Sequence, residues 1–178
     1  MMDTEKYIED PNNAYSFQYE YKFSNTYRCI TANYIKPENL DKLDLENRNI
    51  NDLAINGDYL EELIIPNGVT CAIVADLSLR KLYVPDSMEF LYCQNNCLKE
   101  LELPENIYNV DASNNYIEKV TFRNSAKQLK YLNLKNNRIA DFDFTIPESL
   151  NYLNIENNPH IHVSPKISLF INMNPIYE

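Results

Sequence analysis

The sequence predicts a parallel β-solenoid made of short repeats, preceded by a β-hairpin. Two observations support this prediction: units of nearly constant length recur in one register, and each contains a stretch in which apolar residues alternate with other residues. Alternation at a period of two is typical of a strand that is buried on one side. Units that each contribute one such strand can stack and share a continuous core. The units are residues 40–59, 60–78, 79–97, 98–116, 117–138 and 139–160, with a partial unit at 161–176.

The second half of each unit follows the pattern LxxLxLxxNxL, as in IYNVDASNNYI at 107–117 and LKYLNLKNNRI at 129–139. This is the pattern of a leucine-rich repeat. The alternation places Val110 and Ala112 on one side of a short strand and the intervening residues on the other. Strands of successive units should pair in parallel about 4.8 Å apart, bury the apolar side and expose the other side as a concave face. The predicted fold class is therefore a leucine-rich-repeat solenoid, a right-handed superhelix of the α/β class that is here mostly β.

An asparagine closes the strand in most units, at the ninth position of the pattern. Its side-chain amide can bond the unpaired backbone groups of the turn, so stacked asparagines should form a structural ladder. In the 60–78 unit Leu77 occupies this position, and we expect a weaker turn there. The predicted ladder consists of Asn96, Asn115, Asn137, Asn158 and Asn174.

Prolines recur at one position in the first half of three units, as Pro66, Pro85 and Pro104. Because proline lacks the N–H that a strand ladder needs, we expect this half to be extended or polyproline-like. A full α-helix does not fit into a 19-residue unit, although the two 22-residue units have room for a 3₁₀ turn. The convex side is therefore predicted to consist of extended, polyproline-like or 3₁₀ segments.

Residues 1–39 do not fit the repeat and are predicted to form an N-terminal cap. The segment 14–24 alternates strictly between aromatic and polar residues, which is a strong strand pattern. With residues 26–35 it would form a hairpin whose aromatic face covers the open end of the core, since terminal repeats need a cap. At the C-terminal end we expect no cap. Residues 168–172 should form a seventh strand with an uncovered edge, to which a partner or a second copy can pair.

The units LKELELPENIYNVDASNNY (98–116) and IEKVTFRNSAKQLKYLNLKNN (117–137) resemble the short repeats of YopM-type and IpaH-type bacterial effectors. In those proteins units of LxxLPxLPxxLxxLxVxxN occur together with slightly longer ones. The resemblance covers roughly residues 40–176 and implies a curved, mostly parallel-β solenoid that binds other proteins. The ubiquitin-ligase cysteine of IpaH-type proteins lies in a domain that follows the repeats, and no residue of this chain matches it.

The composition argues against several classes of function. The chain of 178 residues has a net charge of -10, which repels nucleic acids and anionic membranes and favours basic partners. Its two glycines cannot build a phosphate-binding loop, and no apolar run approaches the ~18 residues of a membrane span. The N-terminus resembles neither a secretory signal nor a transit peptide. We therefore expect a cytoplasmic protein, in the host-cell cytoplasm if its source is a virus or a pathogen.

The stretch YCQNNC at 92–97 looks like half of a metal motif, but the repeat explains it. Cys93 falls at a core position of its unit and Cys97 in the turn. The two histidines, His160 and His162, lie about three units away, or roughly 14 Å at ~4.8 Å per strand, which is too far for a shared metal. We expect no metal, no cofactor and no catalytic residue, and predict that the protein is not an enzyme.

The concave face is the predicted binding site for a protein partner. Its strands expose large aromatic residues of the kind that anchor protein interfaces. For Tyr131 and Tyr152, the alternative role is to stack along the strands and stabilise the sheet. The chain is thus predicted to be a non-enzymatic scaffold for protein–protein interaction, with a homodimer through the C-terminal edge strand as the alternative. The predicted contact residues are Ile73, Phe90, Tyr92, Asp111, Tyr131, Asn133, Tyr152, Asn154 and Phe170.

Overall fold

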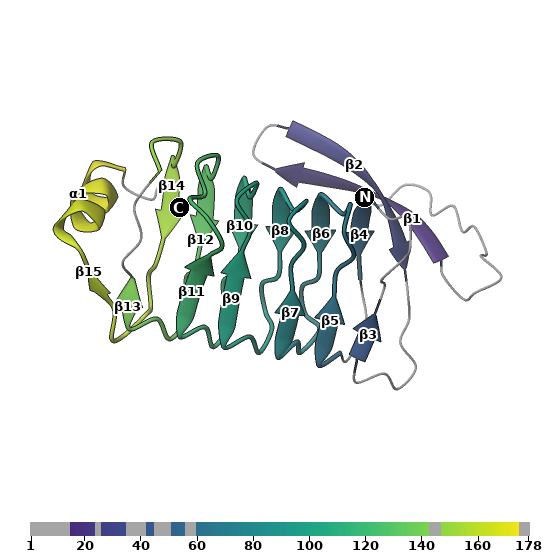
Figure 1. The fold of residues 1–178 in the computed structure, drawn as a ribbon, viewed down its shortest axis with the longest axis horizontal. Coiled ribbons are helices and arrows are strands. Elements are labelled where there is room, and N and C mark those ends of the chain that lie inside the picture. Colours follow the sequence, from purple (N-terminus) through teal and green to yellow (C-terminus); the bar gives the residue numbers. More distant parts are fainter. Residues whose placement is uncertain are drawn as a thin grey trace.

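The protein folds as a parallel β-solenoid with a hairpin towards one end and a short helix at the other (Figure 1). A computed structural model describes residues 15–23, 26–34, 42–44, 51–55, 60–142 and 147–174. Only the backbone is described for 15–23, 26–34, 42–44 and 141–142. Along the solenoid, strands alternate between two faces, which we call the front sheet and the back face (Figure 1).

The front sheet is a continuous parallel sheet in the order β14-β12-β10-β8-β6-β4. Its side chains alternate as the repeat pattern predicts: Leu132 is fully buried, whereas its neighbours Tyr131 and Asn133 are partly exposed. The longer units keep the same register, with Asn109 opposite Tyr131. The front strands are β4 (Asp52–Ala54), β6 (Cys71–Ile73), β8 (Phe90–Tyr92), β10 (Asn109–Asp111), β12 (Tyr131–Asn133) and β14 (Tyr152–Asn154).

The back face also consists of parallel strands, in three separate sheets, β3-β5-β7, β9-β11 and β13-β15. Of the predicted alternatives, the extended conformation is the one that these segments adopt, and the described back strands are neither polyproline-like nor 3₁₀. Pro66, Pro85 and Pro104 stand one or two residues after β5, β7 and β9, so they leave the N–H groups within each strand free to pair. The back strands are β3 (Lys42–Asp44), β5 (Glu62–Ile64), β7 (Lys81–Tyr83), β9 (Glu100–Leu103), β11 (Lys119–Phe122), β13 (Asp141–Phe142) and β15 (His162–Val163).

One hydrophobic core fills the space between the two faces. Leu63 of the back face and Leu91 and Leu132 of the front sheet have no exposed surface. Burying such a side chain contributes about 1.5–3 kcal/mol, so each coil depends on its neighbours for most of its stability. Cys93 belongs to this cluster as a small apolar residue.

Buried asparagines hydrogen-bond the backbone in most of the described turns that follow a front strand. Asn115 is typical: its Nδ2 donates to the carbonyls of Cys93 and Ala112 at 3.0 and 3.1 Å, and its Oδ1 accepts from the Leu98 N–H at 3.0 Å. In the turn that lacks an asparagine, the N–H groups of Leu77 and Leu79 both donate to Oδ1 of the next unit's asparagine. The buried asparagines with this bonding are Asn96, Asn115, Asn137 and Asn158.

A helix, α1 (Pro165–Met173), stands where the sequence predicts a seventh strand. The Ser164 side chain accepts a bond from the Ile167 N–H at 3.4 Å, and proline at the first helical turn suits the missing donors there. Ile167, Phe170 and Ile171 follow helical spacing and pack against the core.

Three predictions for this end of the chain are wrong. Residues 168–172 form no edge strand, and Phe170 packs on the core from the helix instead of lying on a concave strand. The last coil has a cap, because the helix covers it with Ile167 fully buried. Asn174 is the C-cap residue of α1 and not a rung of the asparagine ladder. The edge strand invoked for a homodimer is therefore not formed by this segment.

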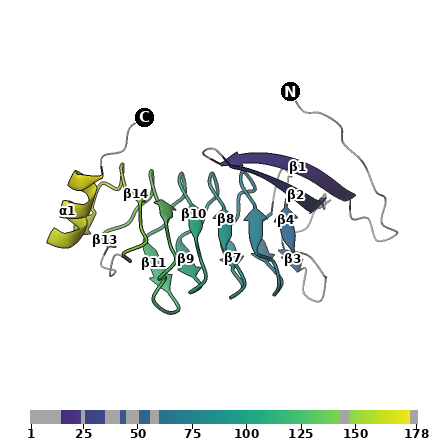
Figure 2. The same cartoon turned by 90° about the horizontal axis from the view of Figure 1, so that it is seen from above.

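The N-terminal strands β1 (Tyr15–Phe23) and β2 (Thr26–Tyr34) pair antiparallel as a hairpin. In Figures 1 and 2 the hairpin lies on the front-sheet side, across the end formed by β4, β6 and β8, and β2 is in contact with β4. The aromatic face predicted for the hairpin concerns side chains outside the described residues. Its backbone position nevertheless divides the front sheet into a covered half and an open half.

Candidate functional site

The covered half of the front sheet carries a small apolar cluster, separate from the main core. Cys71 and Tyr92 are 1% and 4% exposed, and Ile73 and Phe90 pack against them. The hairpin lies over these strands (Figure 2). Tyr92 is buried and not exposed as the sequence predicts, whereas Ile73 and Phe90 remain partly exposed. The alternation of the strand sets the side on which a residue lies, but a segment distant in sequence determines whether that side meets solvent.

The open half consists of β10, β12 and β14. Tyr131 and Tyr152 occupy the same register position on neighbouring strands, and their rings stack with centroids 4.2 Å apart and planes 4° from parallel. Both side chains are partly exposed. Two rings held by a paired sheet form a flat and rigid aromatic surface, with little side-chain entropy left to lose on binding.

A hydrogen-bonded group of polar side chains lies beside the tyrosines. Oδ1 of Asp111 accepts from the Ser113 hydroxyl at 2.7 Å, and its Oδ2 accepts from Nδ2 of Asn133 at 3.1 Å, which links β10 to β12. Asp111 and Asn133 are both partly exposed. The group therefore presents a positioned carboxylate to solvent on the open half.

Asn154 does not lie on the surface as the sequence predicts. It is 4% exposed, its Oδ1 accepts from the Glu156 N–H at 3.0 Å, and its Nδ2 donates to the Tyr152 hydroxyl at 3.3 Å. Its amide thus holds the end of β14 and the neighbouring tyrosine. Glu156 forms an ion pair with Lys135 at 3.0 Å across the edge of the open half.

The sequence reasoning missed two residues at the boundary between the halves. The Lys130 ammonium lies 4.8 Å from the centroid of the Tyr108 ring, and that ring lies 5.5 Å from the ring of Phe90. Both residues directly precede a front strand, outside the three positions that the alternation assigns to the surface. The signal for them was their shared repeat position, at which the Lys130 N–H donates to the Tyr108 carbonyl of the preceding coil.

A second row of asparagines, which the sequence reasoning also missed, runs along the exposed turns. Each residue has a φ of 55–57°, which asparagine tolerates better than most residues. Their side chains bond one another: Asn114 donates to Asn95 at 2.9 Å, and Asn136 donates to Asn114 at 2.6 Å. The doublet NN in four consecutive units was the signal. The row is formed by Asn95, Asn114, Asn136 and Asn157.

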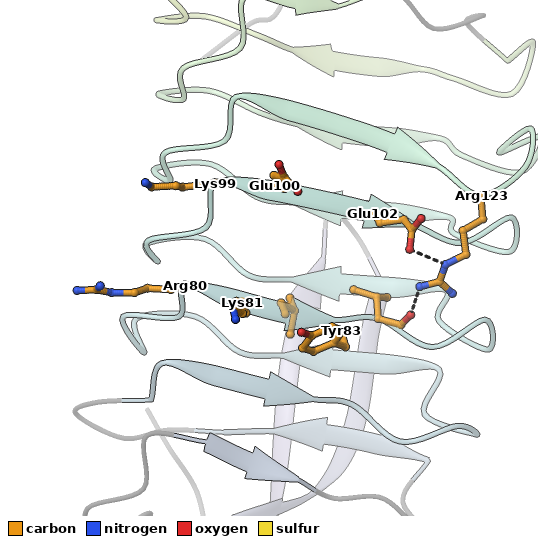
Figure 3. Close-up of a pocket in the computed structure, with 9 residues that line it drawn as sticks. Arg80, Lys81, Tyr83, Lys99, Glu100, Glu102 and Arg123 are labelled. Atoms are coloured by element: carbon orange, nitrogen blue, oxygen red, sulfur yellow. Dashed lines mark hydrogen bonds and ion pairs between the residues drawn. The ribbon is translucent and has the colours of Figure 1, made fainter.

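The back face has a cavity of about 480 Å³ between β7 and β9 (Figure 3). Its basic residues include Arg80, Lys81 and Arg123, and each forms an ion pair with a glutamate: the first two with Glu61 and Glu62 of the preceding coil, and Arg123 with the cavity residue Glu102. Tyr83, at 50% exposure, forms part of the rim.

Among the described cysteines, Cys71 and Cys93 are buried and pack as apolar residues. Burial raises the pKa of the Cys93 thiol far above its ordinary value, and the charge of Asp111 adds to this shift.

Over the described ranges, no three His, Cys, Asp or Glu side chains are arranged to hold a metal ion. Among those same residues no helix has the length and apolar character needed to cross a membrane.

No protein-family model, no curated protein and no solved structure matches this chain.

Proposed function

We propose that the protein is a leucine-rich-repeat scaffold that binds a protein partner through the open half of its front sheet. The main observation in support of this proposal is the stacked pair of Tyr131 and Tyr152 on a parallel sheet. Tyrosines of this kind are enriched among residues that dominate binding energy. A role in sheet stability alone is the competing interpretation, because cross-strand aromatic pairs also stabilise sheets.

Two features support the assignment to leucine-rich repeats. The units place one apolar-x-apolar strand per 19–22 residues in the front sheet, and the asparagine after the strand bonds the backbone of its own turn and of the preceding coil, as Asn115 does. The scaffold would carry no catalytic group and would act in the cytoplasm.

The chemistry of the open half favours a partner with basic side chains. Asp111 offers a positioned carboxylate, and arginine or lysine can stack on the tyrosine rings. The net charge of -10 would also speed the approach of a basic partner at low salt. We therefore propose that a basic, extended surface of the partner lies across β10, β12 and β14.

The test compares a double variant, Tyr131→Ala with Tyr152→Ala, with the native chain in affinity purification followed by titration of the captured protein. If these rings anchor the interface, affinity should fall about 30-fold, since anchor residues typically contribute 2 kcal/mol or more. Tyr83→Ala is the matched control, because it removes a tyrosine that is 50% exposed on the back face, away from the open half.

The outcome that would overturn the proposal is unchanged affinity in the double variant. Circular dichroism of each variant checks folding. A second variant guards against loss of fold: Asp111→Asn keeps the shape of the side chain but removes the charge, and should weaken binding of a basic partner several-fold at low salt. Weakening that does not depend on salt would contradict the basic-partner part of the proposal.

A further inference from the structure

The back face is interrupted at two places where the front sheet is continuous, between β7 and β9 and between β11 and β13, and a cavity lies at the first of them. β8 and β10 pair in the front sheet, yet β7 and β9, on the same two coils, belong to separate sheets. We call this gap the β7–β9 seam, with Lys81–Tyr83 on one side and Glu100–Leu103 on the other. The cavity of about 480 Å³ lies in it (Figure 3). At the seam Leu82 is partly exposed, whereas its register equivalents Leu63 and Leu101 are 0% and 1% exposed.

One end of the seam lacks a backbone donor because of a proline. Where β9 and β11 pair, the Arg123 N–H donates to the carbonyl of Leu103 at 3.0 Å. Between the preceding two coils, the equivalent hydrogen bond would join the N–H of residue 104 to the carbonyl of Val84. Residue 104 is proline, which has no N–H. The Val84 carbonyl therefore cannot receive its ladder bond.

The side chain of Arg123 supplies that bond from one coil further along. Its Nη2 donates to the Val84 carbonyl, its Nη1 bonds Asp86, and its Nε donates to Glu102 at 3.1 Å. One guanidinium thus connects both sides of the seam (Figure 3). The carboxylates that hold it are well exposed, at 83% for Asp86 and 61% for Glu102, so salt can weaken this connection.

Opposite charges also occupy one repeat position on the two sides of the seam. Glu62 is opposite Lys81 in the β5–β7 pair and Glu100 is opposite Lys119 in the β9–β11 pair, so the charges alternate along four successive coils. Lys81 forms an ion pair with Glu62 on its own side at 3.8 Å, and among the described ion pairs none joins it to Glu100. If the seam closed, Lys81 could pair with Glu100, and the alternating charges would continue across it.

We propose that the β7–β9 seam is a hinge: the coils on its two sides rotate about the continuous front sheet, and Arg123 is a strap that limits how far the back face opens. The front strands β8 and β10 form the axis, because their pairing persists while the back strands separate. Opening the back face would change the curvature of the front sheet, and with it the spacing between the covered and open halves.

The test measures amide hydrogen exchange by NMR in the native chain and in Arg123→Met, which keeps an apolar stem but removes all three bonds. With the strap removed, exchange at residues 81–84 and 100–103 should rise about tenfold, while exchange in the front strands 90–92 and 109–111 should not change. Arg138→Met is the matched control, because it removes an arginine that stacks on Tyr116 at 4.4 Å, away from the seam. One molar salt should shift the native chain towards the variant's behaviour.

A locking pair separates hinge motion from general loosening. Lys81→Cys with Glu100→Cys introduces a disulfide at one register position across the seam. When oxidised it should abolish the extra exchange of Arg123→Met, and reduction should restore it. Unchanged exchange in Arg123→Met would overturn the proposal. Equal increases in the front and back strands, or a locked variant that still exchanges quickly, would overturn it as well.

Discussion

The guanidinium of Arg123 donates a hydrogen bond to the backbone carbonyl of Val84, 39 residues earlier in the chain. Burial alone would lower the pKa of this guanidinium, but the hydrogen bonds and charges of Asp86 and Glu102 raise it above its ordinary value. Arg123 stands at the register position that Pro66, Pro85 and Pro104 occupy in earlier coils. An arginine thus stands where the earlier coils have a proline. Its side chain donates to the Val84 carbonyl, which Pro104 leaves without a backbone donor.

This relationship predicts a coupling between Arg123 and Pro104. In the native chain Pro104→Ala should cost about 0.4–1 kcal/mol, because it loosens the unfolded chain. In Arg123→Met the same change should cost less or stabilise, since the new N–H can bond the Val84 carbonyl. A double-mutant cycle by urea denaturation should give a coupling of at least about 0.5 kcal/mol. Strict additivity would show that the two residues do not serve the same carbonyl.

The buried asparagine ladder predicts a large loss for a small change. Asn115→Ala should lower the free energy of unfolding by roughly 1–3 kcal/mol, because it leaves the buried Leu98 N–H without its partner. It also removes one of the two asparagine bonds from each of the Cys93 and Ala112 carbonyls, which keep their bonds from Asn96 and Asn137. Asn106→Ala removes one exposed bond, to the Asp86 carbonyl, and should change stability by no more than about 0.5 kcal/mol. Equal effects in urea denaturation would count against the ladder.

The C-terminal helix predicts which apolar residues matter there. Ile167 is fully buried, so Ile167→Ala should cost about 2–4 kcal/mol. Leu169 is 60% exposed, so Leu169→Ala should cost less than about 0.5 kcal/mol. A seventh strand over 168–172 would bury Leu169, and a large effect of Leu169→Ala in thermal or urea unfolding would favour that strand.

Cys93 predicts a loss of stability at alkaline pH. Its thiol has an ordinary pKa of 9.0, and burial raises this value in the folded state. The folded chain therefore keeps a proton that the unfolded chain loses above about pH 9. The stabilisation is complete below that pH and declines as the pH rises above it, by up to about 1.4 kcal/mol per pH unit. The difference in unfolding free energy between the native chain and Cys93→Ala should shrink from pH 8.5 to pH 10.5, and a constant difference would contradict the shift.

Where structure departs from prediction, the reason is usually a competition between segments. The strand pattern of residues 168–172 is real, but Ser164 and Pro165 start a helix whose Ile167, Phe170 and Ile171 together cover the last coil. The prolines do end pairing as expected, yet only after each back strand has formed, because the residues before them alternate and can pair.

By itself the sequence determined the repeat, the side of the strand on which each residue lies and the core. A period of two and a unit of 19–22 residues leave Leu132 no side but the inner one, and Asn115 no place but the turn. Only the tertiary structure decided which outer residues meet solvent: Tyr92, on the strands that the hairpin crosses, is buried, whereas Tyr131 and Tyr152 are partly exposed. It also decided where the back face separates. Repeat positions depend on local periodicity, whereas coverage and separation depend on contacts between segments that no local pattern encodes.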